Sequence, residues 1–242
     1  MSRGTPGAEF DRHAARYESE TEQGLRASGE SQAYFARGRV AHLRAWWVAA
    51  KRPEPGRILD YGCGVGATTP LLAEAFPASR VLGVDPSAAS IARAEAEQAG
   101  ERRAFQVLQD GEPPEPAELV YLNGVVHHVQ PADRAAFMTR LAGLVGPGGV
   151  AAVYDNNPAN PGTRWVMSRI PFDRDAVPVW PAGLRAGLAA AGLRPLRTDF
   201  LFYFPAFLKP LRPLEPYLMR LPLGAQYGVL ACAPGEGDGE GR

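Results

Sequence analysis

Short apolar runs alternate with helical patterns along the chain, and this order restricts the possible folds more than any other feature. Five runs are predicted strands: 57–62, 80–85, 104–109, 118–123 and 149–155. Helical spacing of apolar residues marks three of the connections: 68–76, 87–100 and 131–145. Parallel strands need such crossovers, which are right-handed and cover both faces of a sheet. We therefore predict an α/β fold, a doubly wound and mostly parallel sheet with helices on both faces.

Local signals place the ends of two of these helices. Ser87 stands where it can cap the start of the second helix, and Gly100 where it can end it. In the third helix, Phe137, Leu141 and Leu144 share one face, and the sequence PGG then stops the helix. These positions predict which side of each helix meets the sheet.

Composition argues against several classes of function. Of 242 residues, 26 are Lys or Arg and 26 are Asp or Glu, so the chain lacks the charge excess of a nucleic-acid-binding protein. Cys63 and Cys232 form neither a disulfide framework nor a zinc-binding pattern. No N-terminal apolar region and no run long enough to cross a bilayer is present. We expect a cytoplasmic protein without stable membrane insertion, ending in a polar, disordered tail at 234–242.

A glycine loop follows the first predicted strand, in the sequence ILDYGCGVGATTP at 58–70. Read loosely, Gly62, Gly64 and Ala67 match the spacing of a dinucleotide-binding loop, and Asp85 stands where a ribose-binding acid is expected. Asp60 argues against that ligand, because like charges ~4 Å apart repel by up to ~4 kcal/mol at an effective dielectric constant near ~20. A ligand that carries an ammonium or a sulfonium and no phosphate is favoured instead, and S-adenosylmethionine (SAM) has both cations.

Three motifs together resemble the class I SAM-dependent methyltransferase family: DYGCGVG, then VLGVD, then LVYLNGVVHHV. The resemblance covers residues 57–155. The flanks YFARGR (34–39) and NNPANPGTRWV (156–166) resemble a bacterial subgroup of that family. The resemblance to this family implies SAM as cofactor and a seven-stranded sheet whose last strand runs antiparallel. Three further elements are then expected: strands at 193–204 and 226–233 and a helix at 181–192, with Leu184, Leu188 and Ala191 facing the sheet.

The resemblance also implies roles for individual residues around the cofactor. Gly62, Gly64 and Gly66 let the backbone approach the methionine part of SAM, and Asp60 faces its ammonium group. Asp85 takes both ribose hydroxyls.

The resemblance implies further cofactor contacts from residues before and after the glycine loop. Pro86 lies against the adenine, Asp110 accepts a hydrogen bond from the adenine amino group, and Asn123 lies beside the sulfonium. Tyr17 and Arg39 are candidates to close over the methionine carboxylate, although a solvated surface position is an equal alternative for Arg39.

His127 and His128 are the candidate catalytic residues. They are adjacent, so they cannot both face the same way. By resemblance, the loop after the fourth strand borders the acceptor, and a histidine there can take a proton at neutral pH. Two interpretations stay open for His127, a catalytic or substrate-orienting role and simple packing beneath the loop. Packing is favoured for His128.

A metal site is not predicted. Asp155, Asn156 and Asn157 are similar to the Asp-Asn pair of a magnesium-dependent branch of the family, but that branch also has an Asp where this chain has Asn123 and Gly124. A hard cation needs several oxygen ligands, and one segment supplies too few. We interpret the run as a turn that opens the next loop.

The predicted organisation is an N-terminal cap or lid segment at 1–50 and a SAM-binding domain at 51–233, with acceptor-side insertions at 156–180 and 205–224. Prolines in the second insertion prevent one long helix. Aromatic residues on these connections suggest a lid that forms an apolar cavity with the segment around Tyr17 and Tyr34: Trp165, Phe172, Trp180, Phe202, Phe204, Phe207 and Tyr217. The competing hypothesis is an apolar patch for a partner subunit or a membrane surface.

These observations predict a SAM-dependent methyltransferase that acts on an O, N or C nucleophile of a small lipophilic or aromatic metabolite. The main alternative is a related cyclase or pericyclase that binds SAM without methyl transfer. An NAD-dependent oxidoreductase and a non-catalytic binding protein are less favoured. The number of subunits is left open, with a homodimer as one option.

Overall fold

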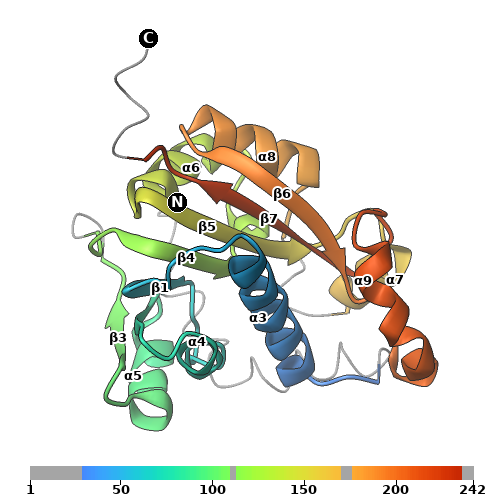
Figure 1. The fold of residues 1–242 in the computed structure, drawn as a ribbon, viewed down its shortest axis with the longest axis horizontal. Helices are drawn as coiled ribbons and strands as arrows, with labels where there is room; N and C mark the ends of the chain where they lie inside the picture. Colours follow the sequence, from blue (N-terminus) through green and yellow to red (C-terminus); the bar gives the residue numbers. More distant parts are fainter. Residues whose placement is uncertain (1–28, 110–112, 170–175, 236–242) are drawn as a thin grey trace, which may run out of the picture.

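A seven-stranded sheet with helices on both faces forms the protein (Figure 1). The structure is a computed structural model that describes residues 29–109, 113–169 and 176–235. The strand order is β3-β2-β1-β4-β5-β7-β6. β7 pairs antiparallel with both β5 and β6, and all other neighbouring strands are parallel. The predicted doubly wound α/β fold with an antiparallel last strand is confirmed.

The strands are β1 (Arg57–Tyr61), β2 (Arg80–Asp85), β3 (Arg103–Val107), β4 (Ala117–Asn123), β5 (Val145–Asn156), β6 (Arg194–Leu201) and β7 (Gln226–Cys232). The helices are α3 (Gln32–Ala49), α4 (Thr69–Ala75), α5 (Ala88–Gln98), α6 (Arg134–Gly143), α7 (Pro161–Met167), α8 (Pro181–Ala190) and α9 (Glu215–Leu218), with 3-10 helices η2 (Val126–His128) and η4 (Ala206–Leu214).

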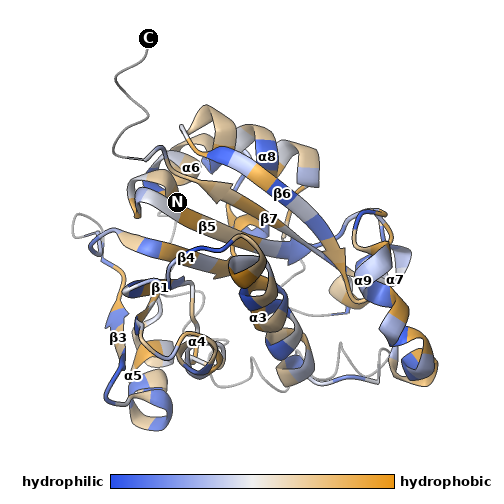
Figure 2. Ribbon diagram, viewed as in Figure 1, coloured by the Kyte–Doolittle hydropathy of each residue, from blue (hydrophilic) through white to orange (hydrophobic). Residues whose placement is uncertain are grey.

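The core is divided into two apolar layers by the sheet. Successive residues of a strand point to opposite faces, so Ile58 packs beneath α3 and α4 while Leu59 packs beneath α6 and α8. Leu43 and Trp47 of α3 are almost fully buried in the first layer. The strands in the middle of the sheet are therefore hydrophobic on both faces, and Figure 2 shows them largely orange.

Several predicted helix features are present. Ser87 caps α5, since its Oγ accepts a hydrogen bond from the Ser90 amide at 3.1 Å. Phe137, Leu141 and Leu144 are all buried against the sheet.

The predicted ends of two helices shift. α5 ends at Gln98, because Ala99 is already extended, and Gly100 instead bridges to Arg103. α6 spans Arg134–Gly143, and the PGG sequence lies inside β5, which begins at Val145.

The C-terminal elements lie close to their predicted positions. Leu184 and Leu188 of α8 are buried, and Ala191 packs against the same cluster while partly exposed. Between β6 and β7 the chain forms η4 and the four-residue α9, so the prolines do prevent one long helix. Gln226, the first residue of β7, pairs with Asn156 of β5 and with Leu201 of β6. β5 and β6 therefore end at the same edge of the sheet, and the insertion leaves from that edge.

No helix in the described part of the chain is both long enough and apolar enough to span a bilayer.

Replacement of Leu43 tests how much the docking of α3 contributes to stability. Leu43 is completely buried, so Leu43→Ala should lower the free energy of unfolding by about 2–5 kcal/mol. Val48 lies near the end of the same helix with 57% of its surface exposed, and Val48→Ala should change that free energy by less than about 0.5 kcal/mol. Chemical denaturation measures both, and equal losses would contradict the burial of α3 against the sheet.

Candidate functional site

The glycine loop that follows β1 is held against β2. The amides of Gly62 and Cys63 both donate to the Val84 carbonyl, at 2.8 and 3.0 Å. Gly62, Gly64 and Gly66 adopt φ values of +74°, +54° and +78°, which favour glycine.

The three glycines differ in what surrounds them. A Cβ atom at Gly62 would lie 2.5 Å from Val125, and one at Gly66 would lie 2.8 Å from Phe105. A Cβ atom at Gly64 would meet nothing within 4 Å. Packing therefore excludes side chains at two positions, while the third faces open space in which a ligand can approach the backbone.

Asp85 ends β2 beside this loop, as its predicted role requires. Its Oδ2 accepts from the Gly64 amide and its Oδ1 from the Ser87 amide, each at 2.9 Å. The carboxylate is therefore fixed between the glycine loop and the start of α5, directly before Pro86. A carboxylate in this position can accept hydrogen bonds from ligand hydroxyls.

Asp60 lies near the end of β1 and is 2% exposed. The pKa of its carboxyl group is raised from the ordinary 3.8 to about 7, chiefly because the group is buried. A hydrogen bond from Thr69 Oγ1 at 2.7 Å and the charge of Arg39 act to lower this pKa, while the charge of Asp85 acts to raise it. Burial, Asp60 and Asp85 also raise the pKa of the Cys63 thiol. The loop is therefore an acidic environment that favours a cation and disfavours a phosphate.

Arg39 of α3 is buried, so the alternative of a solvated surface position is wrong. Its Nε donates to Tyr121 Oη at 3.1 Å and its Nη1 to Gln226 Oε1 at 2.8 Å. Among the described residues, no carboxylate forms an ion pair with it. A buried guanidinium with neutral partners can still bind an anionic ligand group, so its predicted contact with a methionine carboxylate stays a prediction.

A histidine–aspartate pair lies at the ends of β4 and β5. His127 Nδ1 is 2.6 Å from Asp155 Oδ1, and the two side chains are 4% and 1% exposed. Asp155 Oδ1 also accepts from the Asn156 amide at 2.7 Å, while Asp155 Oδ2 is buried without a hydrogen-bond partner in the described part of the chain. The carboxylate favours the His127 tautomer that carries its hydrogen on Nδ1. In that tautomer the lone pair of the ring is on Nε2.

The same corner contains Asn123, the last residue of β4. Gly124 turns the chain there with φ +68°, and a Cβ atom at Gly124 would lie 3.6 Å from His127 Cε1. The His128 ring lies beside the His127 ring at a centroid distance of 4.2 Å, with the two ring planes tilted by 52°. Asn123 and His127 are thus brought together at the carboxyl end of β4, where ligands of such sheets lie.

Asp155 was expected only to form part of a turn, and its contact with His127 is not visible in the sequence. Asn157 does stabilise a turn, because its Oδ1 accepts from the Ala159 amide at 3.1 Å and its Nδ2 donates to the Gly224 carbonyl at 2.7 Å. In the described residues, no cluster of three or more His, Cys, Asp or Glu could hold a metal ion. Tyr17, Asp110 and Phe172 lie outside the described residues.

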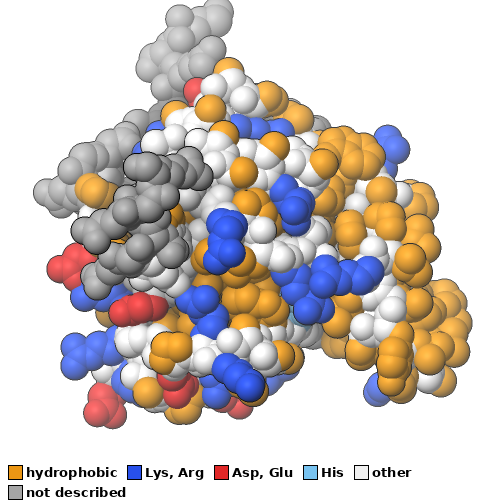
Figure 3. Space-filling model, turned by 45° about the horizontal axis from the view of Figure 1, so that its top comes forward, with side chains coloured by type: hydrophobic (Ala, Val, Ile, Leu, Met, Phe, Trp, Pro, Cys, Tyr) orange, Lys and Arg blue, Asp and Glu red, His pale blue; other side chains and the backbone are white. Residues whose placement is uncertain are grey.

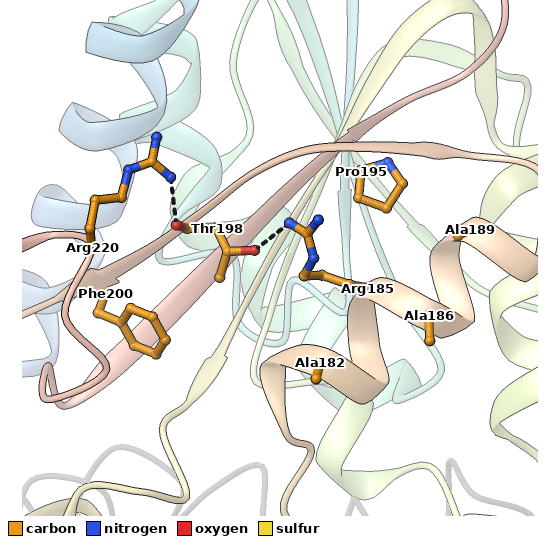
Figure 4. A pocket seen from close by; sticks show the side chains of 8 residues that line it. All are labelled: Ala182, Arg185, Ala186, Ala189, Pro195, Thr198, Phe200 and Arg220. Carbon is orange, nitrogen blue, oxygen red and sulfur yellow. Dashed lines mark hydrogen bonds between the residues drawn. The ribbon is translucent and has the colours of Figure 1, made fainter.

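A separate open groove lies between α8 and β6, away from these residues (Figure 4). Arg185 Nη1 donates to Thr198 Oγ1 across it at 3.0 Å, and Arg220 Nη1 donates to the Thr198 carbonyl at 3.1 Å. None of the predicted site residues lines it. Its lining is Ala182, Arg185, Ala186, Ala189, Pro195, Thr198, Phe200 and Arg220.

Comparison with known families matches residues 59–151 to a methyltransferase domain model. That segment contains Asp60, the glycine loop, Asp85, Asn123 and His127. Trans-aconitate 2-methyltransferase of Acidovorax sp. (strain JS42) is 37% identical over 101 residues, which are 42% of this chain and 38% of that protein. The match thus spans about two fifths of the length of that relative.

Solved structures show the same fold. Magnesium protoporphyrin IX methyltransferase from Synechocystis PCC 6803, solved with bound SAM, has a TM-score of 0.62 and 16% identity, covering 96% of this chain and 99% of that one. The cyclase SpnF has a TM-score of 0.56 and 17% identity, covering 80% of each chain. Together with the domain match, the first of these structures supports SAM as the cofactor.

In the absence of SAM, the Asp60→Asn variant should be more stable than the unmodified protein at alkaline pH. With its pKa at 3.8 in the unfolded chain and about 7 in the folded one, Asp60 keeps its proton longer when folded. The free energy of unfolding therefore falls as pH rises across this window and stays low above it. Asparagine does not titrate, so the stability advantage of the variant should grow by roughly 3 kcal/mol between about pH 5 and about pH 8. Denaturant unfolding at the two pH values measures this, and a difference independent of pH would contradict the raised pKa.

Proposed function

We propose that the chain is a class I SAM-dependent methyltransferase and that it transfers a methyl group to an O, N or C nucleophile of a small lipophilic or aromatic acceptor. One observation carries this proposal: Asp60 and Asp85 flank a glycine loop whose middle residue, Gly64, faces open space. Two carboxylates and an exposed backbone match a cationic ligand with ribose hydroxyls, and they match no phosphate.

The residues of the loop would bind and orient the cofactor. Asp85 has both oxygens oriented by backbone amides and would accept from the ribose hydroxyls, while Asp60 would face the ammonium group. Arg39, which lies on α3, would bind the carboxylate of the methionine part of SAM. When bound, SAM supplies a methyl group on a sulfonium, and the thioether that remains after transfer is a good leaving group. The contribution of the protein is then mainly alignment of the acceptor with that methyl group.

His127 would orient the acceptor and take its proton. Asp155 holds the ring by Nδ1 and favours the charged imidazolium, so Nε2 would accept a proton from a hydroxyl or amine. Proton transfer of this kind typically contributes about 10²–10⁴-fold in rate. His128 packs beside His127 and is assigned no part in the proton transfer.

The acceptor class rests on the connections at the carboxyl edge of the sheet. Phe202 packs on Tyr34 and Phe35 of α3, with ring centroids 5.7 and 4.9 Å apart. Arg212 of the insertion stacks on Tyr34 at 4.5 Å. The insertion at 205–224 therefore contacts the N-terminal helix, as a lid over the acceptor would require. Closure of that lid over the cofactor stays a prediction.

The relatives matched in sequence are named for trans-aconitate, a polycarboxylate, which differs from the acceptor proposed here. Because the match covers only part of each chain, the acceptor needs its own test. The purified protein should be incubated with SAM and, separately, with trans-aconitate and a set of lipophilic phenols and amines. A product heavier by one methylene, with equivalent loss of SAM, supports methyl transfer. Methylation of trans-aconitate alone would contradict the lipophilic acceptor while keeping the reaction.

The alternative of a SAM-binding cyclase is retained because SpnF has this fold. Product mass separates the two reactions, since cyclisation leaves the mass of the substrate unchanged and does not consume SAM.

Asp85→Ala should weaken SAM binding by about 1.5–3 kcal/mol, because it removes a charged acceptor from two hydroxyl groups. Asp133 is exposed and its side chain makes no capping hydrogen bond, so Asp133→Ala serves as a matched control and should bind SAM normally. Isothermal titration measures both affinities. Unchanged affinity in a folded Asp85→Ala protein would remove the residue from the cofactor site.

His127→Ala should reduce turnover by about 10²-fold or more and leave SAM affinity nearly intact. Asp155→Asn should also lower turnover, since the carboxylate that orients the His127 ring is lost. His128→Ala is the matched control and should retain most activity. If His127→Ala turns over normally, the residue is not the base.

A further inference from the structure

The β6–β7 insertion presents its hydrophobic side chains to solvent. Of the eleven large hydrophobic residues that are exposed in the described part of the chain, six lie within this single segment. Phe207 is 78% exposed and Tyr217 84% exposed. We call these six residues the apolar platform: Phe207, Leu211, Leu214, Tyr217, Leu221 and Leu223.

The platform is attached to the rest of the protein by polar contacts on its inner side. Glu215 Oε1 accepts from the amides of Tyr203 and Phe204 at 3.1 and 3.0 Å. Tyr203 Oη lies 2.6 Å from the carbonyl oxygens of Leu218 and Leu221. The polar atoms of Glu215 and Tyr203 therefore point inward, whereas six hydrophobic side chains of the segment face solvent. Such exposure indicates an interaction site.

Basic residues outnumber acidic ones in the two chain segments that form and flank the platform, although Arg212 pairs with Glu30 at 2.7 Å and Arg220 Nη1 lies 3.5 Å from Asp199 Oδ1. α7 is attached beside it, since Asn160 Nδ2 donates to the Leu223 carbonyl and Thr163 Oγ1 to the Ala225 carbonyl, each at 2.7 Å. Residues 156–169 and 201–226 together contain one carboxylate, Glu215, which points inward. The basic residues of these two stretches are Arg164, Arg169, Lys209, Arg212 and Arg220.

An exposed tryptophan adds a feature typical of interfacial segments. Trp165 of α7 is 46% exposed, and the guanidinium of Arg169 stacks 3.9 Å from its ring. Figure 3 shows hydrophobic side chains gathered at the end of the molecule that carries the insertion, with basic side chains beside them. Aromatic and basic groups at the rim of an apolar surface are suited to the headgroup region of a bilayer.

We propose that the apolar platform docks on the surface of a membrane that contains anionic lipids. The six hydrophobic side chains would enter the boundary between headgroups and acyl chains, and Arg164, Arg169 and Lys209 would contact lipid phosphates. A second copy of the chain fits this surface less well, because a two-fold contact would bring the same basic residues against each other. The proposal is independent of the reaction that the protein catalyses.

Vesicle co-sedimentation of the full chain tests this docking. Vesicles of about 30% phosphatidylglycerol in phosphatidylcholine should bind the protein roughly tenfold more tightly than pure phosphatidylcholine, and added salt should reduce the difference. A combined Phe207→Ser, Tyr217→Ser and Leu223→Ser variant should bind the anionic vesicles at least about tenfold more weakly. All three residues are more than half exposed, so the fold should persist.

The matched control replaces two exposed hydrophobic residues outside the platform. Val48→Ser with Trp180→Ser, at 57% and 59% exposure, should bind vesicles like the unmodified protein. SAM affinity measured by titration should be the same in all three proteins, which separates this test from that of the proposed function. Absence of vesicle binding, or equal binding by the platform variant, would overturn the proposal. Self-association of the unmodified chain that the platform variant abolishes would also overturn it, in favour of a contact between copies.

Discussion

The buried carboxylate of Asp60 is the feature on which the site depends. It lies one residue before the end of β1 with Thr69 as its hydrogen-bonding partner, and the cost of its burial is the main cause that raises its pKa to about 7. A cationic group of a ligand would offset that cost, whereas a phosphate would increase it. The burial that raises the pKa of Asp60 would therefore also favour a cationic ligand over an anionic one. Asp85, fixed by the Gly64 amide, extends the negative region along the edge of the next strand.

Much of the fold could be predicted because its signals are local. The limits of β2 agree with the prediction, since a short apolar run lies between turn residues. The contact between His127 and Asp155 could not be predicted, although both were noticed, because it depends on which strands are neighbours. Asn123 pairs with Tyr154 across β4 and β5, and only that register brings the following residues together. Burial of Arg39 was equally hidden, since periodicity does not reveal which side of an isolated helix carries a buried charge.

α3 docks on the sheet through polar as well as apolar contacts. Beside Leu43 and Trp47, its His42 bridges Tyr154 Oη at 2.9 Å and Asp199 Oδ2 at 2.8 Å. Arg39 meets Tyr121 one helical turn earlier. Hydrophobic packing tolerates small rotations of a helix, whereas these directional contacts do not, so they define one orientation of α3 over the strands. The position of the Arg39 guanidinium relative to the cofactor loop is thereby specified.

The antiparallel last strand has a consequence for what surrounds the site. β6 runs in the same direction as β5, and β7 returns beside both. In a sheet of this topology the connection from β6 to β7 must leave from the edge where the parallel strands end, which is the edge that binds ligands. Any residues inserted there lie beside the cofactor and acceptor without disturbing the core. The segment at 205–224 occupies this position, with Glu215 directed inward and hydrophobic side chains directed outward. An acceptor that partitions into lipid would then be met at the same edge of the sheet as the proposed cofactor site.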